Sequence, residues 1–253
     1  MTEAELCDYW RMLRARVAVM AAMDTERLVF GAHSAAWGHG YGILPPIPEK
    51  QIARFESRNR LQLPPAYRTF LIHYGAGGAG PGYGIADFSR AIAPHDFTVP
   101  FPFSGTVALD AHHAASCAGR APEGLGYLGT AGCGSDAYIE LNGTQPGTVW
   151  CSGAGDGAFY PYEDFHTWME RWAGRVERAA AIIVQFRDLT ERHAAGALTL
   201  ERAVSVLGPQ ISRRPVGDGT WTVRFASGGG ALRCDEVGAV LDVVGPRKGG
   251  LGS

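Results

Sequence analysis

The stretch from Ile52 to Ile85 reads IARFESRNRLQLPPAYRTFLIHYGAGGAGPGYGI and carries two helical patterns separated by Leu63-Pro64. Proline at this point ends the first helix and starts the second. In the second helix the large apolar side chains recur at three- and four-residue steps, which commits one side to a core: Tyr67, Phe70, Leu71 and Tyr74. The stretch therefore predicts a helix pair joined at a proline corner, on which the rest of the chain is built.

Glycines follow this helix pair, and Gly75, Gly77 and Gly80 spell the dinucleotide-binding pattern G-x-G-x-x-G. That pattern binds a pyrophosphate when it follows a strand and opens a helix. Here it follows a helix and leads towards an extended segment that contains proline. We therefore interpret the glycines as a helix terminator and flexible connection, and we predict no cofactor.

Composition narrows the class of protein. The 253 residues are 46% hydrophobic, enough for a sizeable core in one main domain with an appendage. A net charge of -2, with arginine and acidic residues interleaved, disfavours nucleic acid and membrane as partners. The five cysteines have no paired spacing and are odd in number, which favours a reducing cytoplasm. No run approaches the roughly 18 uncharged apolar residues of a membrane span.

Two further helices are predicted from apolar stripes. The first covers residues 3 to 23, with its stripe at Leu6, Trp10, Leu13, Val17 and Met20. The second is capped by Asp164 and holds the helical period over five turns: Phe165, Trp168, Met169, Trp172, Val176, Ala180 and Ile183. We assign both stripes to a core.

The clearest strand signal lies between Tyr127 and Cys151. Alternation within residues 136 to 141 predicts one core face and one acidic face with an aromatic: Ala137, Ile139 and Leu141 on the first, and Asp136, Tyr138 and Glu140 on the second. A loop over residues 142 to 147 would place Ile139 opposite Trp150. From Phe97 to Phe103, alternating Phe and Pro predict an irregular or edge segment.

The last part of the chain predicts a smaller unit. After a boundary near residues 187 to 197, Thr199 can cap a short helix, and three short strands follow. The expected organisation is an N-terminal helix and loop over 1–47, a main domain over 48–187, a helix plus three-stranded meander over 198–246 and a flexible tail over 247–253.

No motif for chemistry is present in the sequence. There is no nucleophile elbow, zinc-binding H-E-x-x-H pair, kinase signature or phosphate loop. We predict a protein that is not an enzyme, with no catalytic, cofactor-binding or metal-binding residues. One enzyme hypothesis is left open, a site assembled from His112, His113 or Cys133.

The helix pair resembles the entry motif of the SUKH superfamily, which is named for the yeast Smi and Knr cell-wall regulators and includes many bacterial proteins. The resemblance rests on residues that succeed one another in this order: Phe55-Glu56, Leu61, Leu63-Pro64, Tyr67, Phe70-Leu71 and Tyr74-Gly75. Later elements agree in order: Gly143, Gly147, Val149-Trp150, Phe165 and Trp168. Tyr-Gly-Ala-Gly stands here where many members have Asn-Gly.

The resemblance implies an α+β domain, with a mixed or antiparallel sheet flanked by helices, that serves as a binding scaffold. Bacterial members are mostly immunity proteins that neutralise a cognate protein toxin by occluding it. On this basis we expect a cytoplasmic immunity protein whose acidic, aromatic-bearing surface meets a basic toxin. The candidate contact residues are Asp136, Tyr138, Glu140, Asp156 and Tyr160. The alternatives are an ordinary solvated strand face and a regulatory or scaffold protein of cell-envelope processes.

Overall fold

The computed structural model describes residues 1–33, 38–92, 97–108, 122–152, 158–216, 220–225, 230–235 and 239–245. The chain divides into two compact units, one of residues 1–19 and 34–173 and one of residues 20–33 and 174–253. Each combines helices with an antiparallel sheet, which confirms the predicted α+β class. Among the described helices, none is long and apolar enough to cross a bilayer.

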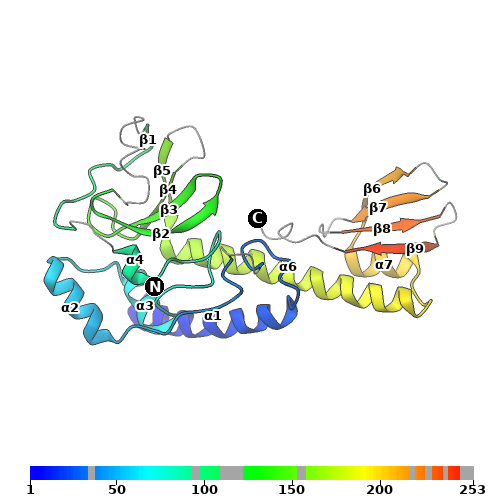
Figure 1. The fold of residues 1–253 in the computed structure, drawn as a ribbon, viewed down its shortest axis with the longest axis horizontal. Coiled ribbons are helices and arrows are strands. Elements are labelled where there is room, and N and C mark those ends of the chain that lie inside the picture. The colour runs from blue at the N-terminus through cyan, green and yellow to red at the C-terminus, as the bar shows by residue number, and fades with distance from the viewer. Residues whose placement is uncertain are drawn as a thin grey trace. The chain divides into compact units, whose positions relative to one another are not determined.

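The first unit contains the predicted helix pair (Figure 1). Its helices are α1 (Glu3–Met23) up to Val19, α2 (Glu49–Asn59), α3 (Pro65–His73), α4 (Phe88–Ala91) and the start of α6 (Phe165–Ala194). All five stripe residues predicted for α1 are buried. Asp164 accepts the Thr167 N–H at 3.0 Å, so the predicted cap of α6 is also confirmed.

Aromatic rings from three helices form the centre of this unit. The ring of Phe70 on α3 lies 5.4 Å from that of Trp10 on α1 and 5.1 Å from that of Phe165 on α6. Tyr67 contacts Phe165 edge-on at 5.2 Å. Such edge-to-face pairs add to the free energy of burying the rings. The helix after the proline corner therefore holds α1 and α6 together, as its apolar side predicts.

The sheet of this unit has the strand order β1-β5-β4-β3-β2, with antiparallel neighbours. Its strands are β1 (Val107–Ala108), β2 (Leu125–Gly132), β3 (Ser135–Glu140), β4 (Thr148–Ser152) and β5 (Ala158–Asp164). Ile139 pairs with Val149, and Trp150 pairs with Tyr138. The expected register was wrong by one residue. Gly147, at φ 98, donates its N–H to the Glu140 carbonyl and closes the hairpin one residue earlier.

This shift puts Trp150 on the same face as Tyr138, and that face has a core of its own. The buried members of this cluster are Phe101, Leu125, Tyr138, Trp150 and Phe159. The Phe-Pro segment is irregular, which was one of the two expected alternatives, and it covers the sheet through Phe101. The Phe101 ring lies 4.8 Å from Trp150, and the Phe101 N–H bonds the Asn142 carbonyl at 2.8 Å. Both faces of β3 are therefore covered at the end of the strand, from Tyr138 to Glu140.

The glycines after α3 form a close backbone crossing, so the flexible connection expected here is wrong. Gly78 exchanges N–H···O bonds with Ile85 at 2.8 and 2.7 Å, and Ala79 donates to the Gly42 carbonyl at 2.7 Å. A Cβ on Gly78, whose φ is 109, would lie 2.3 Å from the Gly42 oxygen. Only glycine lets three backbone segments approach this closely.

The second unit packs the later turns of α6 and α7 (Leu200–Leu207) with a four-stranded sheet of order β6-β7-β8-β9. The strands are β6 (Gln210–Pro215), β7 (Trp221–Phe225), β8 (Ala231–Cys234) and β9 (Val240–Val244). The meander thus has one strand more than expected, because β6 is mostly exposed and lacks the apolar alternation of a buried strand. Thr199 accepts the Arg202 N–H at 3.1 Å, as a cap should. The core consists of Phe186, Leu189, Ala203, Leu207, Val223, Phe225, Leu232, Cys234 and Val240.

Candidate functional site

The acidic strand face predicted as a contact surface does not form as expected. Glu140 is 0% exposed and Tyr138 is 5% exposed, so the expectation that they face solvent is wrong. Asp136 and Tyr160 are half-buried. Asp156 lies outside the described residues. Tyr138 and Glu140 therefore lie together in the protein interior. Among the candidate contact residues that the structure describes, Asp136 and Tyr160 are the ones that are partly accessible to solvent.

Glu140 is buried because its carboxylate ties the hairpin together. It accepts the indole N–H of Trp150 at 3.0 Å and the backbone N–H of Gln145 at 2.5 Å. A Cβ on Gly143 would lie 2.3 Å from the Glu140 Oε1. A side chain at position 143 would therefore clash with the carboxylate, and Trp150 supplies one of its two donors. These residues of the predicted motif therefore have structural roles.

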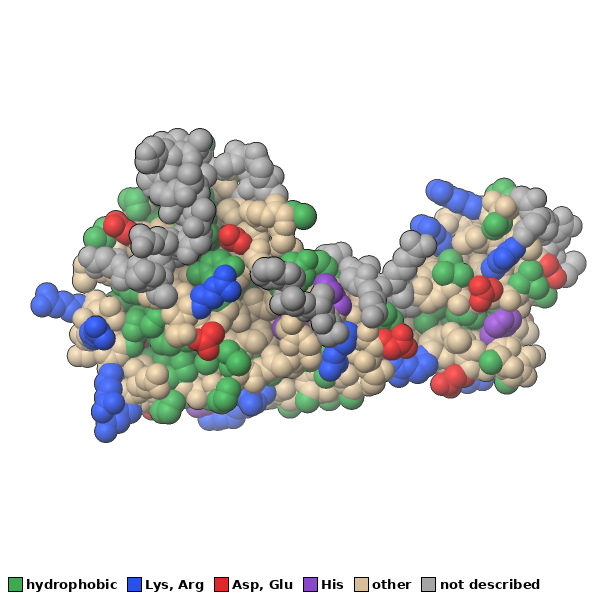
Figure 2. Space-filling view, viewed as in Figure 1, with side chains coloured by type: hydrophobic (Ala, Val, Ile, Leu, Met, Phe, Trp, Pro, Cys, Tyr) green, Lys and Arg blue, Asp and Glu red, His purple; other side chains and the backbone are tan. Residues whose placement is uncertain are grey.

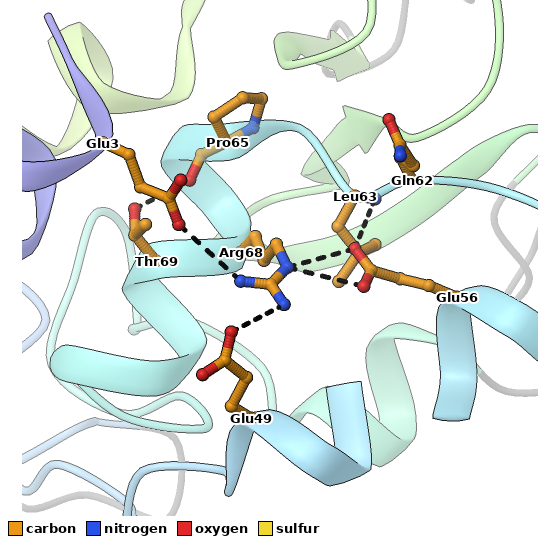
Figure 3. Close-up of a pocket in the computed structure, with 8 residues that line it drawn as sticks. All are labelled: Glu3, Glu49, Glu56, Gln62, Leu63, Pro65, Arg68 and Thr69. Atoms are coloured by element: carbon orange, nitrogen blue, oxygen red, sulfur yellow. Dashed lines mark hydrogen bonds and ion pairs between the residues drawn. The ribbon is translucent and has the colours of Figure 1, made fainter. Parts of the chain in front are cut away.

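A second cluster of charge lies at the proline corner of the first unit, in a hollow of about 440 Å³ (Figure 3). Glu56 of α2 accepts the Leu63 N–H at 3.0 Å, and its carboxylate lies 3.3 Å from the Arg68 guanidinium. These contacts join the end of α2 to the start of α3 across Leu63-Pro64. Glu56 therefore fixes the corner that the sequence predicts.

Arg68 also faces two glutamates that are mostly exposed. The distances are 3.1 Å to Glu49 and 3.9 Å to Glu3. Exposed ion pairs contribute little to stability, whereas the Glu56 pair is largely shielded from water. Since each carboxylate of α2 is engaged by Arg68, we interpret this hollow as the tie that orients α2, not as a ligand site.

The other side of α2 borders a groove of about 390 Å³ against α4. Its floor is apolar, with Phe55 packed edge-on against Phe88 at 5.2 Å, and Arg54 and Arg58 also line it. Both arginines are exposed. Figure 2 shows Lys and Arg side chains gathered over α2. Sequence reasoning missed this surface, although the four-residue spacing of basic residues in α2 was a usable signal.

The residues of the open enzyme hypothesis form no recognisable centre in the described part of the chain. His112 and His113 lie outside it, and Cys133 is exposed. Burial raises the pKa of the neighbouring strand thiol, Cys151, to about 11, which keeps it protonated and unreactive at neutral pH. Among the described residues, no three His, Cys, Asp or Glu side chains are grouped to hold a metal ion.

The fold of the first unit defines the class of protein, and a match to a known family then defines the family. The first unit is an α+β domain that combines a helix pair, an antiparallel sheet and a closing helix, and a groove with an apolar floor lies between α2 and α4. Residues 46–171 match the SMI1 / KNR4 family (SUKH-1). The chain belongs to the SUKH superfamily. No curated protein and no solved structure matches the chain significantly.

Proposed function

We propose that this chain is a non-enzymatic binding protein, an immunity protein that neutralises a cognate protein toxin in the cytoplasm by direct binding. Its membership of the SUKH superfamily supports a role in binding. The observation that carries the proposal is the groove beside α2, an apolar floor with an exposed polar border. Protein interfaces combine an apolar centre with a polar rim in this way.

The rigid mounting of α2 supports the same function. Glu56 and Arg68 hold the helix against α3, and Phe55 packs it against Phe88 of α4. A surface that is already ordered loses less conformational freedom when a partner binds. Such preorganisation suits a protein that must bind its target tightly and quickly.

Co-expression tests the proposal. The protein encoded by the adjacent gene is induced in a sensitive host, alone and together with the full chain, and growth is followed. The proposal expects growth arrest that the chain relieves, with a complex recovered by affinity purification. Recovery of several housekeeping proteins, with no rescue, would instead support a regulator of cell-envelope processes.

A further inference from the structure

Helix α2 presents positive charge along one side. Three basic residues follow one another at four-residue steps and are all exposed: Lys50, Arg54 and Arg58. The two carboxylates of the helix, Glu49 and Glu56, are both directed to Arg68. Within the described part of the chain, none of the three basic side chains makes an ion pair.

This arrangement is unfavourable for an isolated helix. Like charges four residues apart on one helix side repel one another and lower its stability. A carboxylate-bearing partner would remove that repulsion and would gain charge-assisted hydrogen bonds, which arginine makes through two parallel N–H groups. The charge pattern of α2 therefore fits an anionic partner.

The groove next to these arginines sets a second requirement on the partner, which must offer an apolar group to the groove. Its floor is formed by Ile47, Phe55, Phe88 and Ile92, and Phe55 and Ile92 are only half-buried. The volume of about 390 Å³ is within the usual range of binding pockets. Asp87 also lines the groove, where its carboxylate accepts the backbone N–H and the hydroxyl of Ser89.

We propose that the groove between α2 and α4 binds an acidic segment of the toxin, in which carboxylates flank a large apolar side chain. The arginines would pair with the carboxylates, and the apolar side chain would fill the floor as an anchor. This inference rests on the proposed function and specifies its contact surface. A phosphate backbone would use the charges but not the apolar floor, so the lining favours a protein segment over nucleic acid.

Peptide binding tests the groove without the toxin. A fluorescein-labelled peptide DEDWLDED is titrated with the full chain, and fluorescence anisotropy is measured beside DEDAADED, KRKWLKRK and a labelled DNA duplex. We expect saturable binding of DEDWLDED, weakened by salt and at least about tenfold tighter than either other peptide. Equal binding of DEDWLDED and DEDAADED, or tighter binding of the duplex, would overturn the proposal.

Charge reversal then tests the groove against the toxin. Arg54→Glu/Arg58→Glu is compared with Arg178→Glu/Arg214→Glu, which makes the same change in net charge at exposed positions in the second unit. Circular dichroism checks that both variants fold. We expect the first variant to lose peptide and toxin binding by at least about tenfold and the second to keep both. If wild type protects cells and the groove variant protects equally, the groove assignment fails while the proposed function stands. If wild type binds the peptide but never the toxin, the proposed function fails instead.

Discussion

The indole N–H of Trp150 donates a hydrogen bond of 3.0 Å to the fully buried carboxylate of Glu140. This pair lies on the sheet face that was expected to be open and acidic. The segment that contains Phe101 covers it, and the carboxylate also accepts the Gln145 N–H. Glu140 therefore stabilises the hairpin and is unavailable to a partner.

Replacing Glu140 by Ala should be strongly destabilising. The change leaves the buried Trp150 indole N–H without its acceptor, which costs about 1–3 kcal/mol, and it also removes the hydrogen bond from the Gln145 N–H. Urea denaturation should show a loss in the free energy of unfolding of about 2–4 kcal/mol. Asp136→Asn, on the same strand, is the matched control and should stay within about 0.5 kcal/mol. Equal effects of the two changes would contradict the role assigned to Glu140.

Thr69 should be more sensitive to loss of its hydroxyl than to loss of its methyl group. Its Oγ accepts the buried Trp10 indole N–H at 2.9 Å, which links α3 to α1. Thr69→Val removes that acceptor and should lower the free energy of unfolding by about 1–3 kcal/mol. Thr69→Ser keeps it and should cost clearly less. Thermal unfolding of the two variants decides the point, and a larger loss in the serine variant would refute it.

The backbone crossing predicts a strong contrast between two glycines. Gly78→Ala forces a Cβ to within 2.3 Å of the Gly42 oxygen at a positive φ, and should cost more than about 3 kcal/mol or prevent folding. Gly105→Ala meets nothing within 4 Å and should change stability by less than about 0.5 kcal/mol. Soluble yield and urea midpoints measure both. A tolerated Gly78→Ala would mean that the segment is flexible after all.

Acid should weaken the start of α6 in two steps. Burial lowers the pKa of His166 below its ordinary 6.5. Burial alone would raise the pKa of Glu170, but hydrogen bonds from Arg16 and Tyr9 outweigh it and lower that pKa below 4.5. A group with a lowered folded-state pKa binds fewer protons than in the unfolded chain, so stability falls as pH falls.

The first step, from His166, should begin as pH drops below about 6.5, and the second, from Glu170, below about 4.5. Denaturant titrations at successive pH values should show that His166→Gln removes the first step and Glu170→Gln reduces the second. Unchanged profiles for both variants would refute the assignment.

Much of the fold followed from periodic patterns, because an apolar stripe depends only on residues near one another in sequence. This applies to α1, the corner at Leu63-Pro64 and the stripe of α6. The errors arose where distant residues decide the outcome. Nothing near residue 140 indicates that Phe101 will cover it, and a one-residue difference at the Gly147 turn moves Trp150 to the other face. Strand β6 was missed for a related reason, since it is paired but scarcely buried.

The candidate binding surface at α2 likewise could not be predicted from sequence patterns alone. The basic residues of α2 are four apart in the sequence, but that spacing alone also fits a solvated helix. Only the packing of Phe55 against Phe88 places an apolar floor beside Arg54 and Arg58. The contact residues expected from strand alternation failed at Tyr138 and Glu140 because alternation does not reveal a second core.

The most direct test of the account is a titration of the toxin's activity. The purified protein from the adjacent gene is assayed for its effect on a defined substrate while the purified full chain is added, and binding is measured by calorimetry in the same buffer. The account predicts loss of activity that is complete near one equivalent of chain. Full toxin activity in the presence of excess folded chain, with no heat of binding, would contradict it.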